Sequence, residues 1–348
     1  IDLTNDSTMQ VIVDKEEGQY LGHPTTVLLE DNKTIYCVYP KGHGRGAIVM
    51  KRSDNAGLTW SERLLTPKSW ETSKEVPTIY RVIDPEGIKR LIMFSGLYPI
   101  RMAVSEDDGK SWSELEPIGD FGGIVAMGCL IPLRTGKGHY MALFHDDHRF
   151  FTENGAEIWK KKRRLANDRE MTLFNTFSYD GGLTWSYPEE IYSSWEIHVC
   201  EPGFIRSPDG NQIAVLLREN SRRFNSQIIF SNDEGKTWTE PRPLPNSLTG
   251  DRHVLKYSHD SRILATFRDV SASRTQFSYY MNKTKKNDVD KLAKEFNLGS
   301  PTEGDWVAWV GTYQDLVEGN EGQYRLRLKD NTRGWDTCYP GLELLPDG

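Results

Sequence analysis

The sequence predicts an all-β fold, a six-bladed β-propeller of four-stranded antiparallel blades, and three observations lead to it. One octapeptide occurs four times, and a strand–turn–strand segment occurs six times. The composition, with 30 Gly, 17 Pro and 10 Trp in 348 residues, is that of a turn-rich β protein. Repeats spaced by roughly 50 residues are typical of propeller blades, each of which is a sheet of four short strands.

The octapeptide has the pattern Ser-x-[Asp/Asn]-x-Gly-x-[Ser/Thr]-Trp, and this pattern is typical of a β-hairpin turn. Its acidic or amide side chain can accept backbone N–H bonds, its glycine can take a positive φ, and its Trp can pack beneath the turn. Because turn chemistry explains every fixed position, we interpret the motif as a structural clamp without catalytic carboxylates. The four copies are SDNAGLTW (Ser53 to Trp60), SEDDGKSW (Ser105 to Trp112), SYDGGLTW (Ser178 to Trp185) and SNDEGKTW (Ser231 to Trp238).

The second repeat is a strand, a turn and a strand, and its copies alternate with the octapeptides. The serines of successive octapeptides are 52, 73 and 53 residues apart, and we interpret the polar stretch 148–170 in the long interval as an inserted loop. We expect a single domain, 1–348, that is truncated within its last blade, because the sequence stops at a turn signal. The alternative is that Met9 to Asp14 form a closing strand. The six units begin at His23, Val76, Ala126, Glu201, Arg252 and Tyr339.

Charge and composition exclude several classes of function. A net charge of -7 leaves no basic surplus for phosphates, so nucleic acid is not an expected partner, and the basic run 160–164 is interpreted as a solvated loop. No apolar stretch reaches membrane-spanning length. Four scattered cysteines form no ligand cluster, so we expect neither a metal nor another cofactor. The first residue is Ile, which fits a processed, secreted or periplasmic protein; the oligomeric state has no sequence signal.

Equivalent positions of the repeated units should lie at equivalent places around the propeller axis, and two such columns are polar. We therefore expect a polar floor at one mouth of the channel; the alternative is that its charges only form salt bridges between blades. The first column, before the first Pro of each unit, contains His23, Val76, Glu201 and Tyr339, with Arg252 or His253 in the fifth unit. The second column, at the end of the second strand, contains Pro40, Ser95, His145, Arg218 and Arg268, followed by Lys41, Gly96, Asp146, Glu219 and Asp269.

Glu201 and Tyr339 occupy the same column in the related sequences CEPGFIRSPDG and CYPGLELLPDG. Taken singly, each is interpreted as an ordinary loop or turn residue. Placed on one axis, the carboxylate of Glu201 could act as a base toward the phenol of Tyr339 and make its oxygen a nucleophile.

These octapeptides, known as Asp-boxes, resemble those of the sialidases, or BNR-repeat proteins, and the resemblance covers essentially the whole chain. It implies that Tyr339 is the nucleophile and Glu201 its partner, an arrangement that departs from the usual pair of carboxylates. Arg218, 17 residues after Glu201, is similar to the second arginine of the carboxylate-binding triad of that family.

The sequence departs from the family at three places. His23 stands where the first arginine is expected, the loop 40–47 lacks the acid/base Asp, and no arginine precedes Tyr339 at the third triad position. We expect His43 to replace the missing acid/base, because histidine titrates near neutral pH. Arginines that could bind an anion instead are Arg45, Arg252 and Arg268.

The resulting hypothesis is an exo-acting glycoside hydrolase for a terminal, acidic sugar of a glycan, with Tyr339, Glu201 and His43 as catalytic residues. The alternatives are a propeller polysaccharide lyase that uses His and Tyr, and a glycan-binding propeller without activity. The expected substrate-binding residues are Arg218, Arg45, His23, Arg252, Arg268, Asp146 and His145. Glu75 and Arg101 either shape the pocket or are exposed loop residues.

Overall fold

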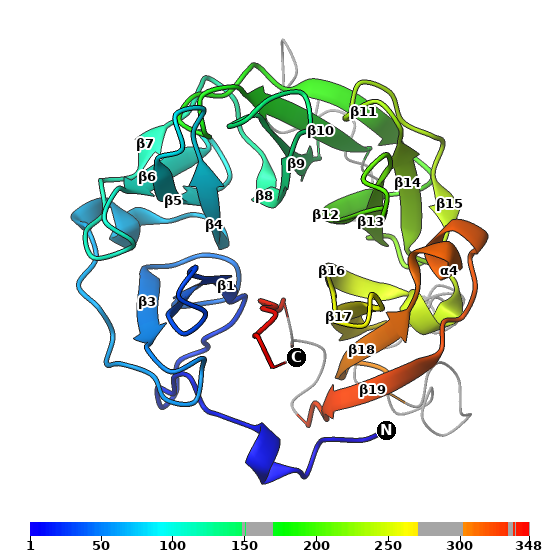
Figure 1. Cartoon of the computed structure of the whole chain (residues 1–348), viewed down its shortest axis with the longest axis horizontal. Coiled ribbons are helices and arrows are strands. Elements are labelled where there is room, and N and C mark those ends of the chain that lie inside the picture. The colour runs from blue at the N-terminus through cyan, green and yellow to red at the C-terminus, as the bar shows by residue number, and fades with distance from the viewer. Residues whose placement is uncertain (148–149, 151–169, 271–301, 333–336, 338, 348) are drawn as a thin grey trace, which may run out of the picture.

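The computed structural model describes residues 1–147, 150, 170–270, 302–332, 337 and 339–347. Five antiparallel sheets surround a central axis, with the first strand of each sheet innermost (Figure 1). Innermost strands of successive sheets contact one another in the order β1, β4, β8, β12 and β16. This arrangement confirms the predicted all-β propeller with antiparallel blades.

The blades follow the order of the chain, four strands at a time after the first. Blade 1 consists of β1 (Thr25–Leu28), β2 (Ile35–Pro40) and β3 (Ile48–Ser53). Blade 2 consists of β4 (Pro77–Ile83), β5 (Lys89–Ser95), β6 (Arg101–Ser105) and β7 (Glu116–Pro117). Blade 3 consists of β8 (Ile124–Pro132), β9 (Tyr140–Asp146), β10 (Met171–Ser178) and β11 (Glu189–Ser194).

Blade 4 consists of β12 (Val199–Arg206), β13 (Ile213–Glu219), β14 (Gln227–Ser231) and β15 (Arg242–Pro243). Blade 5 consists of β16 (Gly250–Tyr257), β17 (Ile263–Asp269), β18 (Trp306–Gly311) and β19 (Tyr324–Lys329), with the helix α4 (Tyr313–Glu318) before its last strand. Three 3-10 helices complete the elements: Ser7–Met9, Lys68–Thr72 and Asn246–Leu248.

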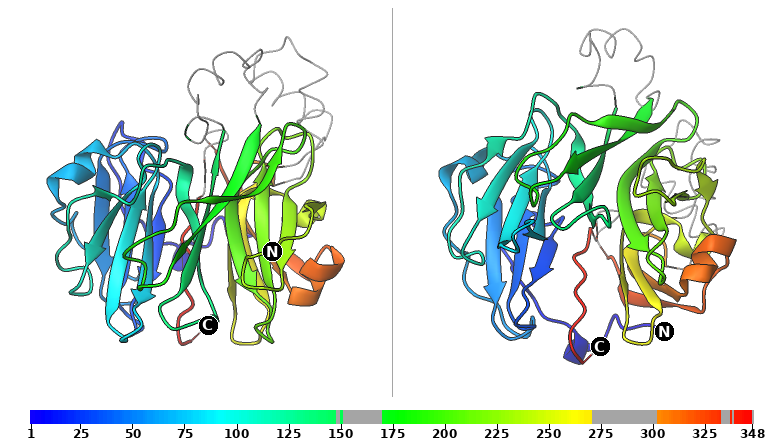
Figure 2. Two further views of the ribbon diagram at one scale, coloured as in Figure 1. Left: turned by 90° about the horizontal axis from the view of Figure 1, so that it is seen from above. Right: turned by 45° about the horizontal axis from the view of Figure 1, so that its top comes forward.

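The prediction of six blades is wrong for the described residues, which form five. The sixth unit contributes only the extended segment 339–347, which has no partner strand there and so forms no sheet. This segment lies on the axis between blades 1 and 5 (Figure 2). Glu343 ties it to both blades, because its carboxylate accepts from Thr26 Oγ1 (2.8 Å) and from Lys256 Nζ (2.5 Å).

The alternative of a closing strand at Met9 to Asp14 is also not found, since these residues form no strand. The N-terminus instead reaches blade 5, where Leu3 N donates to Arg327 O of β19 (2.8 Å). Asp14 accepts a hydrogen bond from Arg63 Nε (2.7 Å). The expected inserted loop 148–170 lies almost wholly outside the described residues. Among the described residues, no helix has the length and apolar character needed to cross a membrane.

The core lies between neighbouring blades, which explains why the middle strands are apolar on both faces. β13 shows this pattern, with Ile213 to Leu217 all buried, because blade 3 covers one face and blade 5 the other. The blades therefore stack by apolar packing. Polar residues can then occupy the ends of the strands, at the mouth of the central channel.

The octapeptides form the predicted turn clamps. In the third copy, Asp180 Oδ1 accepts from Thr184 N (3.0 Å), and the hydroxyl of Ser178 accepts from Gly182 N (2.9 Å). The buried Trp185 donates its indole N–H to Gly182 O (3.0 Å). In this copy the Ser, Asp and Trp side chains all hold the turn, as expected of a structural element.

Candidate active site

Bulges in the innermost strands turn selected side chains out of the ladder and toward the axis. In β12, Cys200 pairs with Arg218 and Gly203 with Leu216, so that two residues, Glu201 and Pro202, face only one residue of β13. A β-bulge of this kind bends the strand and redirects its side chains. The register of the sheet therefore places Glu201 beside the end of β13.

Most of the first column predicted from the repeats shares one backbone conformation. His23 (57°), Glu201 (49°), Arg252 (55°) and Tyr339 (83°) have positive φ, whereas Val76 does not; in the third unit, Val125 (48°) has the same conformation. Such φ values are uncommon outside glycine and carry a conformational cost. Their recurrence in every unit except the second indicates that the propeller favours this conformation. In the fifth unit it identifies Arg252, not His253, as the column residue.

Tyr339, Glu201 and Arg218 form a compact triad. The hydroxyl of Tyr339 donates to Glu201 Oε1 (2.6 Å), and Arg218 Nη1 lies 2.7 Å from both oxygens. Tyr339 and Glu201 are buried, with 6% and 5% of their surfaces exposed. Glu201 Oε2 has no hydrogen-bond partner within the described parts of the chain. The contact predicted between Glu201 and Tyr339 of the first column is therefore present, and Arg218 of the second column joins it.

The electrostatics of the triad keep the proton on the phenol. Burial raises the pKa of Tyr339 well above its ordinary value; Arg218 opposes this shift and Glu201 adds to it. For Glu201, burial alone would raise the pKa, but the positive charge of Arg218 and the hydrogen bond from Tyr339 hold it below its usual value. The resting site thus pairs a neutral phenol with an ionised carboxylate.

Asp251 organises the arginines around this triad. It is fully buried, and its carboxylate accepts from Arg222 Nη2 (2.6 Å) and Arg268 Nε (2.9 Å) and lies 3.2 Å from Arg218 Nε. Burial would raise the pKa of Asp251, but the three arginines hold it well below its usual value. The guanidinium of Arg268 also lies 5.5 Å from the centre of the Tyr339 ring.

Histidines surround the triad on two other sides. The ring of His23 lies 4.3 Å from that of Tyr339, and the ring of His43 lies 4.7 Å from that of His23, centre to centre. A third histidine contacts the backbone of the triad, since Glu201 N donates to His145 Nδ1 (3.4 Å). The structure therefore gathers residues from both predicted columns and from the loop that contains His43.

Other candidates lie apart from the triad. Arg45 is exposed on the same loop as His43, and Arg252 faces the cavity along the propeller axis. Asp146, next to His145 at the end of β9, accepts from Phe150 N (3.2 Å). Glu75 Oε1 accepts from Val76 N (2.9 Å), and Arg101 donates to Thr72.

Sequence reasoning missed Asp251 and Arg222. A signal existed for Asp251, because a carboxylate replaces the apolar residue that precedes the column in blade 4, where Cys200 stands. No comparable signal existed for Arg222, which reaches Asp251 from the loop after β13. In the described residues, no group of three or more His, Cys, Asp and Glu side chains is arranged to hold a metal ion.

Comparisons with known proteins agree with the fold and place the chain among its relatives. No protein-family model matches it. A sialidase of Clostridium perfringens is 24% identical over 243 residues, which are 68% of this chain and 51% of the relative. A vacuolar protein sorting/targeting protein 10 of Debaryomyces hansenii is 23% identical over 175 residues, 49% of this chain and 10% of the relative. The chain thus spans about half the length of the first of these relatives and a tenth of the second.

Solved structures share the fold at low sequence identity. A protein of unknown function from Dyadobacter fermentans superposes with a TM-score of 0.64 at 14% identity, covering 95% of this chain and 89% of its own. The NanB sialidase of Streptococcus pneumoniae superposes with a TM-score of 0.57 at 11% identity, covering 97% of this chain and 66% of its own. The chain is a divergent homologue of the sialidases, built on a β-propeller like theirs.

Proposed function

We propose that the protein is a glycoside hydrolase that removes a terminal, acidic sugar from a glycan, with Tyr339 as nucleophile and Glu201 as its base. The observation that supports this most strongly is the hydrogen bond of 2.6 Å between the Tyr339 hydroxyl and Glu201 Oε1. The sialidases among its relatives agree with the proposal at the level of the glycan-acting propeller.

The proposed first step forms one bond and breaks one bond at the anomeric carbon, and it moves two protons. The Tyr339 oxygen attacks the anomeric carbon, its proton passes to Glu201 Oε1, and the bond from the sugar to the leaving oxygen breaks. Arg218 Nη1 already lies 2.7 Å from both oxygens, so it can stabilise charge on either during the transfer. The product is a covalent glycosyl–tyrosine intermediate.

The leaving oxygen needs a proton, and we assign this role to His43. Its ring packs against His23, which packs against Tyr339, so the two histidines form one side of the proposed site. In the second step, neutral His43 takes a proton from water, and the resulting hydroxide attacks the anomeric carbon while Tyr339 recovers its proton from Glu201. This sequence returns every group to its starting state.

An acidic sugar fits the charge of the cluster. With Tyr339 neutral, three arginines face the carboxylates of Glu201 and Asp251, which leaves one positive charge in excess. That excess suits a single carboxylate on the substrate, with Arg218 and Arg268 as the nearest donors and Arg45 at the exposed edge. A neutral phenol approaches such a substrate with less repulsion than an anionic nucleophile.

The test combines a substrate panel with a covalent trap. Fluorogenic α-sialosides, β-glucuronides and uronic acid-capped oligosaccharides are incubated with the protein, and we expect release from at least one acidic glycoside. A fluorinated glycosyl fluoride of the accepted sugar should then add its glycosyl mass to the peptide that contains Tyr339. Turnover that continues unchanged in Tyr339→Phe would exclude the proposed nucleophile.

A polysaccharide lyase is the second candidate, and the contact between His23 and Tyr339 favours it. A phenol and an imidazole whose rings are 4.3 Å apart could abstract and return a proton beside a uronate carboxylate. Product analysis separates the candidates: a hydrolase releases a saturated sugar, and a lyase leaves an unsaturated uronate that absorbs ultraviolet light. Binding of acidic glycans without any product would instead indicate a glycan-binding propeller.

A further inference from the structure

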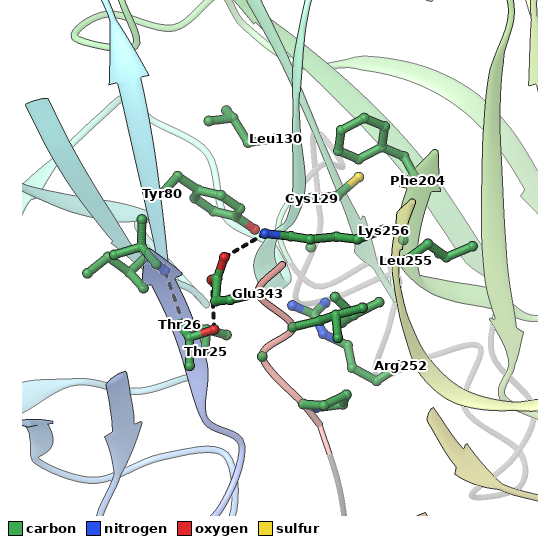
Figure 3. Close-up of a pocket in the computed structure, with 18 of the residues that line it drawn as sticks. Thr25, Thr26, Tyr80, Cys129, Leu130, Phe204, Arg252, Leu255, Lys256 and Glu343 are labelled. Carbon is green, nitrogen blue, oxygen red and sulfur yellow. Dashed lines mark hydrogen bonds and ion pairs between the residues drawn. The ribbon is translucent and has the colours of Figure 1, made fainter. Parts of the chain in front are cut away.

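A cavity of about 310 Å³ lies along the propeller axis, lined by the innermost strand of every blade and by residues 340–343 (Figure 3). Tyr339, at the start of the same segment, lies in the triad, so the cavity begins where the proposed active site ends. Lys256, whose side chain is 41% exposed, indicates where the cavity meets solvent.

One charge in this cavity is not balanced. The ammonium of Lys256 pairs with Glu343, and the guanidinium of Arg81, another lining residue, pairs with Glu30. Arg252 is only 4% exposed, and its Nη1 has no hydrogen-bond acceptor within the described residues. The guanidinium contacts the hydroxyl of Tyr80, which is neutral, so no carboxylate among the described residues balances its buried positive charge.

The groups near Arg252 do not supply the missing negative charge. Asp251, its neighbour in sequence, is occupied by the three arginines of the triad cluster. Tyr80 is a neutral phenol whose hydroxyl donates to Met127 O (2.8 Å) and also interacts with the Arg252 side chain, so it supplies a hydrogen bond but no negative charge. Figure 3 shows the guanidinium of Arg252 directed into the space that the lining residues enclose. An anion from solution would satisfy it.

The remaining walls indicate what kind of anion fits. They are mainly apolar, and a cavity of this size with apolar walls and one charged group is typical of a site for a small organic ligand. An inorganic ion would balance the charge of Arg252, but the apolar walls of the cavity would then remain in contact with water. The apolar side chains of the lining residues include Val27, Ile79, Leu130, Phe204, Leu255 and Leu342.

We propose that this axial cavity is a second ligand site, which binds a small organic monocarboxylate with its carboxylate on Arg252 and its apolar body against blades 1 to 5. The site is separate from the triad and does not depend on the proposed hydrolysis. A planar guanidinium binds a carboxylate through two parallel hydrogen bonds, which explains an arginine at this position.

Thermal unfolding with benzoate as the probe tests the proposal. Sodium benzoate is titrated against sodium chloride at constant ionic strength, and we expect a saturable rise in Tm with half-saturation on the order of 1 mM. At a hundredfold excess over Kd the rise should be about 4 °C. If sodium chloride raised Tm as much as sodium benzoate does, the proposal of an organic ligand would be wrong.

Two variants and a diffraction experiment locate the bound molecule. Arg252→Met should abolish the benzoate shift without lowering the basal Tm, because it removes a buried charge that no carboxylate of the described residues balances. The matched control, Arg45→Met, removes an exposed arginine and should keep the shift. In crystals of the unaltered protein soaked with 4-bromobenzoate, anomalous scattering should place bromine in the axial cavity. Bromine at the arginines around Asp251, or a full shift in Arg252→Met, would refute the site.

Discussion

Strands β12 and β16 have the same backbone but carry opposite charges at the bulge. In each, the residue before the bulge pairs with an arginine at the end of the next strand: Cys200 with Arg218, and Asp251 with Arg268. The bulge residues have nearly the same φ, 49° in blade 4 and 55° in blade 5. Blade 4 therefore presents a carboxylate at the bulge, whereas blade 5 presents an arginine there and a carboxylate one residue earlier.

This difference separates scaffold from chemistry. The propeller backbone determines the positions of the two bulge side chains in each blade. The residue types at these positions determine which groups the side chains contact. In blade 4 a small apolar thiol leaves room beside Arg218 and the bulge residue joins Tyr339. In blade 5 the buried carboxylate of Asp251 collects three arginines, and the bulge residue Arg252 is left for the axial cavity.

The largest expected effect comes from removing the blade 4 carboxylate. Glu201→Gln keeps the shape but cannot accept the proton of Tyr339, so kcat should fall by about 10²- to 10⁴-fold on the substrate identified in the panel. The kcat of Tyr339→Phe should fall at least as far. The kcat of the double variant should be no lower than that of Tyr339→Phe, because the two residues act as one unit. The matched control, Glu30→Gln, alters an exposed carboxylate that pairs with Arg81 and should leave kcat unchanged.

Asp251→Asn removes the carboxylate that is peculiar to blade 5. Three arginines would then share a buried region with only Glu201 to balance them, and the free energy of unfolding should fall by about 3–5 kcal/mol. Urea denaturation measures this loss. The equivalent change in blade 4, Cys200→Ser, should cost about 1–3 kcal/mol for one buried hydroxyl. Equal losses in the two variants would contradict the special role given to Asp251.

The second bulge residue also differs, since Pro202 in blade 4 corresponds to His253 in blade 5. Burial lowers the pKa of His253 to about 4, and its Nε2 donates to Leu248 O (2.9 Å) while Nδ1 has no partner in the described structure. Between pH 4 and 6.5 the unfolded chain therefore binds more protons at this residue than the native state. Stability should rise with pH across this window, by about 3 kcal/mol from His253 alone.

His253→Gln isolates this contribution, because glutamine can still donate to Leu248 O but does not titrate. Urea denaturation of both proteins at several pH values should show a shallower dependence in the variant, by about the same 3 kcal/mol. If the free energies of unfolding of the two proteins changed with pH in parallel, another group would be the cause of the pH dependence.

The smallest expected effects concern the outer turns of the same two blades. Blade 4 closes its turn with Asp233, which accepts from Thr237 N (2.8 Å), whereas blade 5 uses α4, where Thr312 and Asp315 form a capping box. Asp233→Ala and Thr312→Ala should each lower the free energy of unfolding by about 1 kcal/mol. Thermal unfolding should show similar small losses, and unchanged kcat in both variants would confirm that these turns are structural.

Much of this molecule was predictable because repetition carries positional information. The octapeptides fixed the turns, the apolar second strands fixed the blades, and the shared register of CEPG and CYPG placed Glu201 and Tyr339 at one point on the axis. The number of blades was not predictable in this way. A strand pattern at residues 339–348 does not reveal whether partner strands accompany it, and in the described residues none does.

The sequence by itself determined the propeller, its turns and the meeting of Glu201 with Tyr339, because each rests on local chemistry repeated at a fixed period. Only the tertiary structure decided the roles of Asp251, Arg222 and Arg252. Two of the arginines that pair with Asp251 come from blade 4 and the loop after it, and the register that joins Asp251 to Arg268 within blade 5 depends on a bulge that residue types do not specify. Charge compensation in a buried site depends on distances across the axis, which a linear pattern does not contain.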